Sequence, residues 1–156
     1  MKFRSMVVDA EHSGSGVYSE KGDPRVTRVG RIIRATSIDE LPQLFNVLKG
    51  DMALIGPRPL LPEYLPLYTK EQARRHEVRP GITGWAQVNG RSFLPFSKRF
   101  EMDVWYVDHC TLLFDIKIVF LSIKNVLLRK DISIGTNVSR DADDLGFTKY
   151  IEYTKE

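Results

Sequence analysis

Cysteine and histidine are scarce in this chain of 156 residues. Because Cys110 is the only cysteine, the chain can form no internal disulfide and no zinc site of paired thiolates. The three histidines are far apart, at positions that match none of the usual metal-ligand spacings: His12, His76 and His109. We therefore expect any metal ion to bind carboxylates, and the cysteine content favours a reducing compartment.

Long apolar runs and an excess of one charge are also missing. The 23 Lys and Arg residues and 20 Asp and Glu residues leave a net charge of +3, which does not predict a nucleic-acid-binding surface. The chain does not start with the apolar run of a signal peptide. Its most apolar region, 106–128, contains four charged residues and falls short of the ~18 uninterrupted apolar residues of a membrane-spanning helix. We expect the chain not to cross a bilayer, although it can lie on one.

Hydrophobic residues make up 42% of the chain, enough for one globular domain. Within 25–34, arginines recur at every third residue beside a narrow apolar stripe, which predicts a short amphipathic helix with a basic face. These arginines are Arg28, Arg31 and Arg34. Such a face is either a solvated surface or one that binds anions.

Residues 36–50 predict a helix with an apolar stripe and a stop at Gly50. The stripe consists of Leu41, Leu44, Phe45 and Leu48. Proline is tolerated in a first helical turn but not in the interior, so Pro42 places the start near Ile38 or Asp39.

Asp39 and Glu40 then lie in the first turn of that helix, where unpaired N–H groups and the helix dipole favour anions. Ser37 and Glu40 also fit a capping box. The acidic pair therefore either caps the helix or takes part in catalysis.

Residues 52–55 predict a short strand, which Gly56-Pro57-Arg58-Pro59 follows. The two prolines stiffen the backbone around Arg58, and a planar guanidinium suits bidentate phosphate binding. The alternative is a rigid turn without a ligand.

Three further helices are predicted in the second half of the chain. The first covers 69–76, because Thr69 and Gln72 form a capping-box pattern. After a turn at Asn89-Gly90, two longer apolar stripes predict helices through 96–107 and 116–127. The last stripe has Lys117 and Lys124 on a different face. Spacing alone favours a core position for that stripe, but such helices also suit a bilayer interface.

The acidic pair and the arginines near stiff turns together suit a substrate that contains phosphate. Attack at the phosphorus of a diphosphate needs cations around its oxygens, an in-line nucleophile and a neutralised leaving group. Arginines supply part of this charge, and Mg²⁺ on one or two carboxylates supplies the rest. The second carboxylate is a candidate nucleophile, because aspartyl-phosphate intermediates are established chemistry.

Three long motifs, in this order, resemble the bacterial sugar transferases that are monotopic phosphoglycosyl transferases, also called polyprenyl-phosphate sugar-1-phosphate transferases. The motifs are residues 34–59 with the Asp-Glu pair and Gly-Pro-Arg-Pro, residues 79–91 with Pro-Gly-Ile-Thr-Gly-Trp, and residues 100–107. The resemblance covers about Lys2 to Ile134 and implies transfer of a sugar-1-phosphate from a UDP-sugar to a polyprenyl phosphate, undecaprenyl phosphate, with release of UMP. This would be the first membrane step of glycan assembly, at the cytoplasmic face of the bacterial inner membrane.

Residue by residue, the resemblance implies that Asp39 is the nucleophile and Glu40 the Mg²⁺ ligand. Phosphate contacts are implied for Lys2, Arg34, Arg58 and Arg91. Asp103 is a further candidate whose role is either nucleotide binding or structural. The resemblance also shifts the expectation for 106–128 towards the membrane surface.

The chain departs from the family pattern at two places. Family members carry a hydrophobic re-entrant helix before the Lys-Phe-Arg-Ser-Met motif, whereas this sequence begins at the motif, so we expect an N-terminally truncated catalytic domain that associates peripherally with the membrane. The stretch 92–97 lacks the asparagine expected after Gly-Arg, which bears on the choice of sugar.

We therefore expect an α+β fold of several amphipathic helices around a small strand element. Residues 1–134 would form one catalytic domain, and 135–156 a weakly ordered polar tail. Two alternatives remain at this point: a non-catalytic module that binds membranes or polyanions, and a metal-dependent hydrolase of nucleotide diphosphates. The sugar, the pathway and the oligomeric state are left open.

Overall fold

The computed structural model describes residues 2–8, 10, 23–36, 38–90, 94–128 and 143–147. The order of elements is α1 (Arg28–Ala35), η2 (Ile38–Glu40), α2 (Gln43–Lys49), β1 (Ala53–Ile55), η3 (Pro62–Leu67), α3 (Lys70–Ala73), η4 (Arg74–His76), β2 (Gly81–Thr83), α4 (Trp85–Val88), α5 (Phe96–His109) and α6 (Leu112–Leu127), where η marks a 3-10 helix. The predicted single domain of helices around a small strand element is confirmed.

The strand element is a parallel pair in which Ala53 lies opposite Gly81 and Ile55 opposite Thr83. The sequence predicted β1 but not β2, because a parallel partner reached through a long crossover leaves no local signal. Position 81 requires glycine, because the Cβ atom of any other residue would overlap the main chain at Gly56. Close packing of backbones therefore holds the start of the Gly-Pro-Arg-Pro turn against β2.

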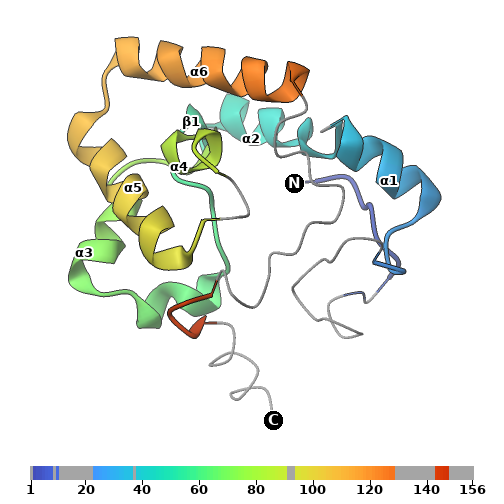
Figure 1. The fold of residues 1–156 in the computed structure, drawn as a ribbon, viewed down its shortest axis with the longest axis horizontal. Coiled ribbons are helices and arrows are strands. Elements are labelled where there is room, and N and C mark those ends of the chain that lie inside the picture. The colour runs from blue at the N-terminus through green and yellow to red at the C-terminus, as the bar shows by residue number, and fades with distance from the viewer. Residues whose placement is uncertain are drawn as a thin grey trace.

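Helix α6 lies along the strand pair and α4, whereas α1 and the N-terminal segment lie at the opposite end of the molecule from α3 and α5 (Figure 1). Two side-chain contacts fix α6. The hydroxyls of Thr83 and Ser122 are 2.7 Å apart, and Asn125 Nδ2 donates to the carbonyl of Val88 at 3.1 Å.

A buried cluster of aromatic side chains joins η3, α5 and the segment 143–147. Its buried members are Tyr64, Phe96, Phe100 and Phe147. Asp144 helps to attach the segment, because its carboxylate accepts hydrogen bonds from the backbone and the hydroxyl of Ser97. Residues 143–147 are thus packed against the domain, which corrects the expectation of a weakly ordered tail for this part. The predicted boundary at residue 134 stays a prediction.

The helix predicted around the acidic pair is divided into η2 and α2, with Pro42 at the N-cap of α2. Gly50 ends α2 with a φ of 84°, as predicted, because glycine adopts this left-handed conformation without strain. The residues of the predicted α2 stripe are exposed rather than packed in a core: Leu41, Leu44, Phe45 and Leu48.

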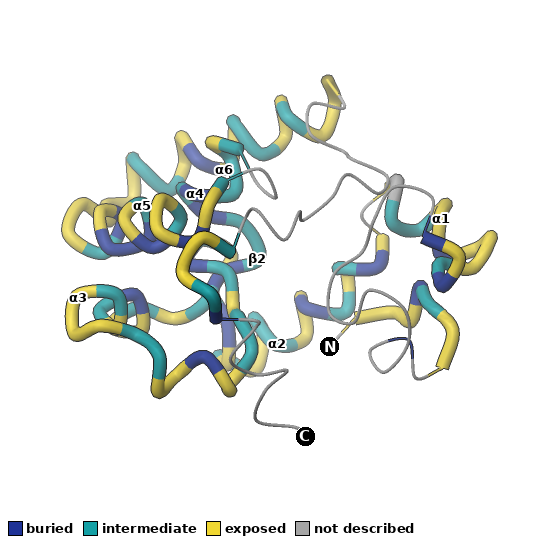
Figure 2. The backbone as a smooth tube through the Cα atoms, turned by 60° about the horizontal axis from the view of Figure 1, so that its bottom comes forward, coloured by how far each residue is buried: buried dark blue, intermediate teal, exposed yellow. Residues whose placement is uncertain are grey.

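The apolar face of α6 is exposed as well, so the core position that its spacing favoured is wrong. Only Ile118 of this helix is fully buried, and much of α1 and α6 is coloured as exposed in Figure 2. The exposed apolar side chains of α6 include Ile116, Phe120, Ile123 and Leu127. Among the described residues, no helix has both the length and the apolar character needed to cross a bilayer.

Candidate functional site

The N-terminal segment is held between α1 and η2 by backbone hydrogen bonds. The amide of Thr27 donates to the carbonyl of Ser5 at 3.1 Å, and the amide of Phe3 donates to the carbonyl of Asp39 at 3.0 Å. Thr27 also caps α1 by accepting a hydrogen bond from the Gly30 amide. These bonds carry Lys2 to the acidic pair, although the two lie far apart in the sequence.

Three segments meet at one carboxylate oxygen of Glu40. Lys2 Nζ donates to Glu40 Oε1 at 2.8 Å, and Arg58 Nη2 donates to the same oxygen at 2.9 Å. The neighbouring Asp39 is buried, with 9% of its surface exposed. The structure therefore brings together four of the predicted site residues.

The two acidic neighbours have opposite pKa shifts. Burial raises the pKa of Asp39 above its usual value, and the negative charge of Glu40 adds to this, against the opposing charges of Lys2 and Arg34. Burial also acts on Glu40, but the charges and hydrogen bonds of Arg58 and Lys2 outweigh it and lower its pKa to about 2. Glu40 is thus a fixed anion, while Asp39 is a more basic carboxylate.

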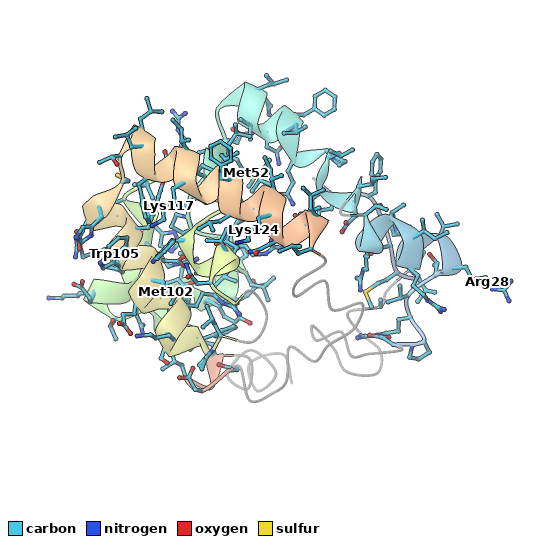
Figure 3. The ribbon with its side chains drawn as sticks, turned by 45° about the horizontal axis from the view of Figure 1, so that its top comes forward. Arg28, Met52, Met102, Trp105, Lys117 and Lys124 are labelled. Atoms are coloured by element: carbon cyan, nitrogen blue, oxygen red, sulfur yellow. The ribbon has the colours of Figure 1, made fainter. Side chains whose placement is uncertain are left out.

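Arg34 reaches this region from the last turn of α1. Its Nε donates to the hydroxyl of Ser5 at 2.7 Å, and its charge acts on the carboxyl of Asp39. Arg28 and Arg31 are exposed, and Arg28 extends away from the rest of the molecule (Figure 3). Of the predicted basic face, only Arg34 belongs to the site.

The main chain of Arg58 is held by Arg75, a residue that the sequence pattern did not single out. Arg75 Nη2 donates to the carbonyl of Arg58 at 2.7 Å and to Asp103 Oδ2 at 2.8 Å. Asp103 thus lies in a buried ion pair, not beside Glu40. Arg75 had no distinguishing signal, since Arg74 precedes it in the same predicted helix. Arg91, the remaining predicted site residue, lies outside the described residues.

The donor set at the site consists of two adjacent carboxylates. Within the part of the chain that the structure describes, no group of three or more His, Cys, Asp or Glu residues is placed to hold a metal ion. Mg²⁺ is commonly held by one or two carboxylates together with substrate phosphates. The residues present therefore fit a hard ion that is completed by its substrate.

Comparisons with known proteins show the family of the chain. The sequence profile of a family described as "Bacterial sugar transferase" matches residues 1–129. A Bacillus subtilis protein named "Uncharacterized sugar transferase EpsL" is 53% identical over 140 residues, which are 90% of this chain and 68% of EpsL. An undecaprenyl-phosphate glucose phosphotransferase of Komagataeibacter xylinus is 45% identical over 141 residues, 83% of this chain and 26% of that protein.

A third relative is named UDP-N-acetylgalactosamine-undecaprenyl-phosphate N-acetylgalactosaminephosphotransferase and comes from Aeromonas hydrophila. It is 47% identical over 132 residues, 81% of this chain and 31% of its own length. The chain therefore spans about two thirds of EpsL but under a third of the other two. With most of its length matched by the profile and by these relatives, the chain belongs to the bacterial sugar transferase family.

Proposed function

We propose that this chain transfers a sugar-1-phosphate from a UDP-sugar to undecaprenyl phosphate and releases UMP, through a covalent phosphosugar intermediate on Asp39. The observation that carries the proposal is the buried Asp39 carboxylate beside Glu40, whose oxygen is held by Lys2 and Arg58. The names of the relatives support the substrate class. The reaction would be the first membrane step in the assembly of a glycan such as a capsule or exopolysaccharide.

In the first step, an Asp39 carboxylate oxygen attacks the phosphorus that is linked to the sugar. The bond from this phosphorus to the UMP oxygen breaks, and UMP leaves with the electron pair. The raised pKa of Asp39 suits this role, because a more basic carboxylate is a better nucleophile once ionised. The product is an acyl phosphate that carries the sugar.

In the second step, a phosphate oxygen of undecaprenyl phosphate attacks the same phosphorus. The bond to the Asp39 oxygen breaks, which regenerates the carboxylate and yields the sugar on a polyprenyl diphosphate. Splitting the transfer in this way lets two bulky substrates, one water-soluble and one in the membrane, use the site in turn.

Lys2, Arg34 and Arg58 supply the positive charge that phosphoryl transfer requires. Glu40 orients two of these cations through its Oε1 atom. Arg58 can bind phosphate oxygens in a bidentate manner, since its guanidinium presents a planar set of donors. These residues would bind the diphosphate and stabilise the charge that develops on the leaving UMP.

Mg²⁺ fits the donor chemistry, and Glu40 would hold it together with the substrate phosphates. With a pKa of about 2, Glu40 is ionised at neutral pH, and its Oε2 atom takes no hydrogen bond from the described residues. When bound, the ion would neutralise negative charge on the diphosphate.

We also propose that α6 and α2 face the cytoplasmic surface of the inner membrane. Both helices expose apolar side chains. An open hollow of about 380 Å³ on α6 is lined by Phe120, Ile123, Lys124, Leu127 and Leu128. Lys117 and Lys124 both project from α6 (Figure 3). A helix with this mixture of apolar and basic residues suits a surface of anionic lipids.

The test is release of UMP from a panel of UDP-sugars with Mg²⁺ and undecaprenyl phosphate. Asp39→Asn should abolish release, and removal of Mg²⁺ with EDTA should stop it. Asp51→Asn is the matched control, because Asp51 is exposed and forms a surface ion pair with Lys49. UMP release that persists in Asp39→Asn refutes the assigned nucleophile. Formation of free sugar phosphate without lipid product would indicate a hydrolase instead.

A further inference from the structure

Arg75 has hydrogen bonds that tie together three parts of the chain. Its Nε and Nη2 atoms donate to Asp103 Oδ2 at 3.0 and 2.8 Å, and its Nη1 atom donates to the hydroxyl of Tyr68 at 3.2 Å. Its Nη2 atom also donates to the carbonyl of Arg58 at 2.7 Å. The guanidinium lies 5.3 Å from the centroid of the Phe100 ring, which fixes its plane further.

The Arg75–Asp103 pair is not placed to touch a substrate. The two side chains are only 1% and 2% exposed. A buried ion pair is also a weak source of stability, because removing two charges from water offsets their attraction. Neither substrate binding nor a gain in folding energy therefore accounts for the pair.

The contact with the carbonyl of Arg58 gives the pair a role. Pro57 and Pro59 have no N–H group, so the backbone on either side of Arg58 has few ways to form hydrogen bonds. The carbonyl of Pro57 accepts from the amide of Gly81 at 3.0 Å, and the carbonyl of Arg58 accepts from Arg75. These two bonds hold the turn from which the Arg58 side chain reaches Glu40.

We propose that Arg75, anchored by Asp103, is a positioning residue that holds the main chain of Arg58 so that its guanidinium reaches Glu40 and the substrate phosphates. This inference rests on the proposed function for the role of Arg58 in catalysis. The connection runs from Asp103 in α5 through Arg75 in η4 to the turn after β1, and from there to η2.

The test distinguishes an effect on the placement of Arg58 from an effect on the stability of the fold. It replaces the pair with apolar residues of similar size, Arg75→Met with Asp103→Leu. Removing both charges together leaves neither member of the pair without its partner, and thermal unfolding first verifies that the double variant is folded. Arg75→Lys is a second variant, because one ammonium group cannot reach Asp103, Tyr68 and the Arg58 carbonyl together. Arg74→Lys is the matched control, since Arg74 forms surface ion pairs with Glu71, Glu77 and Asp108.

Two readouts are measured on folded protein. The first is the ¹⁵N NMR signal of the Arg58 Nε–H group, assigned with Arg58→Lys, with the exposed Arg28 as a reference for a freely solvated side chain. The second is the rate at which the phosphosugar adduct forms with saturating UDP-sugar. We expect the Arg58 signal to move towards that of Arg28 in both Arg75 variants, and the rate to fall by about 10-fold to 100-fold. The Arg74→Lys control should leave both unchanged.

An unchanged Arg58 signal in the folded double variant overturns the inference, whatever the activity. A moved signal with an unchanged adduct rate overturns the catalytic part of it. If the wild type forms no adduct at all, the proposed function fails, and the NMR signal alone then decides whether Arg75 positions Arg58.

Discussion

Asp39 and Glu40 are neighbours in the sequence, yet their surroundings prepare them for different roles. Glu40 meets Lys2 and Arg58 directly, whereas burial dominates the environment of Asp39. Two adjacent carboxylates repel one another, and separating their pKa values avoids holding two equally acidic groups side by side. The residue with the raised pKa is the one to which we assign the attack on phosphorus.

The rate of adduct formation should rise with pH through a midpoint above 3.8, the ordinary pKa of an aspartate. The reason is that only the ionised carboxylate attacks, and burial makes ionisation of Asp39 harder. Quenched single-turnover reactions between pH 4 and pH 8, followed by intact-protein mass, measure this midpoint. A rate that stays constant down to pH 4 contradicts the prediction.

The raised pKa of Asp39 also predicts that Asp39→Asn does not destabilise the fold at pH 7. Because the folded pKa of Asp39 is raised, its contribution to stability is present below the unfolded pKa and is lost as the pH rises through the folded pKa. An amide avoids the cost of a buried charge at pH 7. Denaturant unfolding should give Asp39→Asn a free energy of unfolding equal to or above that of the wild type, and a clear loss is the contrary result.

The lowered pKa of Glu40 predicts the opposite dependence of folding stability on pH. Its folded pKa of about 2 lies below the ordinary 4.5, so its charge stabilises the fold above pH 4.5, and this is lost as the pH falls towards 2. Glu40→Gln should therefore lower the free energy of unfolding by about 1 kcal/mol at pH 7. Unfolding in EDTA at pH 7 and at pH 3.5 should show the difference between variant and wild type shrinking at the lower pH. A constant difference would rule out the ion pairs as its cause.

At the scale of elements, α6 has one buried face and one exposed face. Ile118 is 0% exposed and packs inward, whereas Phe120, two residues later, is 69% exposed. Ile118→Ala should cost about 2–5 kcal/mol of stability, because it removes buried methyl groups and leaves a cavity. Phe120→Ser should change stability little and weaken binding to vesicles of anionic phospholipid. Sedimentation with vesicles and denaturant unfolding test both variants, and unchanged sedimentation of Phe120→Ser argues against the proposed membrane face.

Local signals in the sequence predicted individual elements well. The capping box at Thr69 is confirmed, since its hydroxyl accepts from the Gln72 amide and the Gln72 side chain accepts from the Thr69 amide. Periodicity also identified α1, α5 and α6. It could not tell which stripe is covered, because an apolar stripe has the same spacing whether it faces a core or remains exposed.

Contacts between distant residues were beyond the sequence pattern. The residue pattern singled out Glu40 and Arg58, and the resemblance added Lys2. Their meeting at one oxygen depends on how three segments fold together. Arg75 was missed for the same reason, because its partners Asp103 and the Arg58 carbonyl are far away in the sequence. A residue that acts through tertiary contacts has no local sequence pattern by which it can be predicted.

At the scale of the whole molecule, the segment 143–147 is part of the fold rather than an appendage. Phe147 packs on Tyr64, Phe96 and Phe100 and is 6% exposed. Phe147→Ala should lower the free energy of unfolding by about 3 kcal/mol, within the range for a buried phenylalanine. Leu145→Ala is the control in the same segment, because Leu145 is 37% exposed and lies outside the buried cluster, so its truncation should cost much less. Equal losses for the two variants would show that Phe147 is not a core residue in solution.

Exposed apolar side chains are a property of the molecule as a whole. They gather on α2 and α6, while the aromatic cluster fills the interior between η3 and α5. Large apolar patches on a globular protein mark sites of contact with other molecules or membranes. The exposed apolar surface is therefore consistent with the membrane substrate that we propose.

The most direct measurement is the location of the covalent adduct. The wild-type chain is incubated with UDP-sugars and Mg²⁺ without lipid, and its intact mass and peptide masses are compared with those of Asp39→Asn. We expect one added sugar phosphate on the wild type, on the peptide that contains Asp39, and none on the variant. An adduct on another residue, or one that persists in Asp39→Asn, would refute covalent catalysis by Asp39.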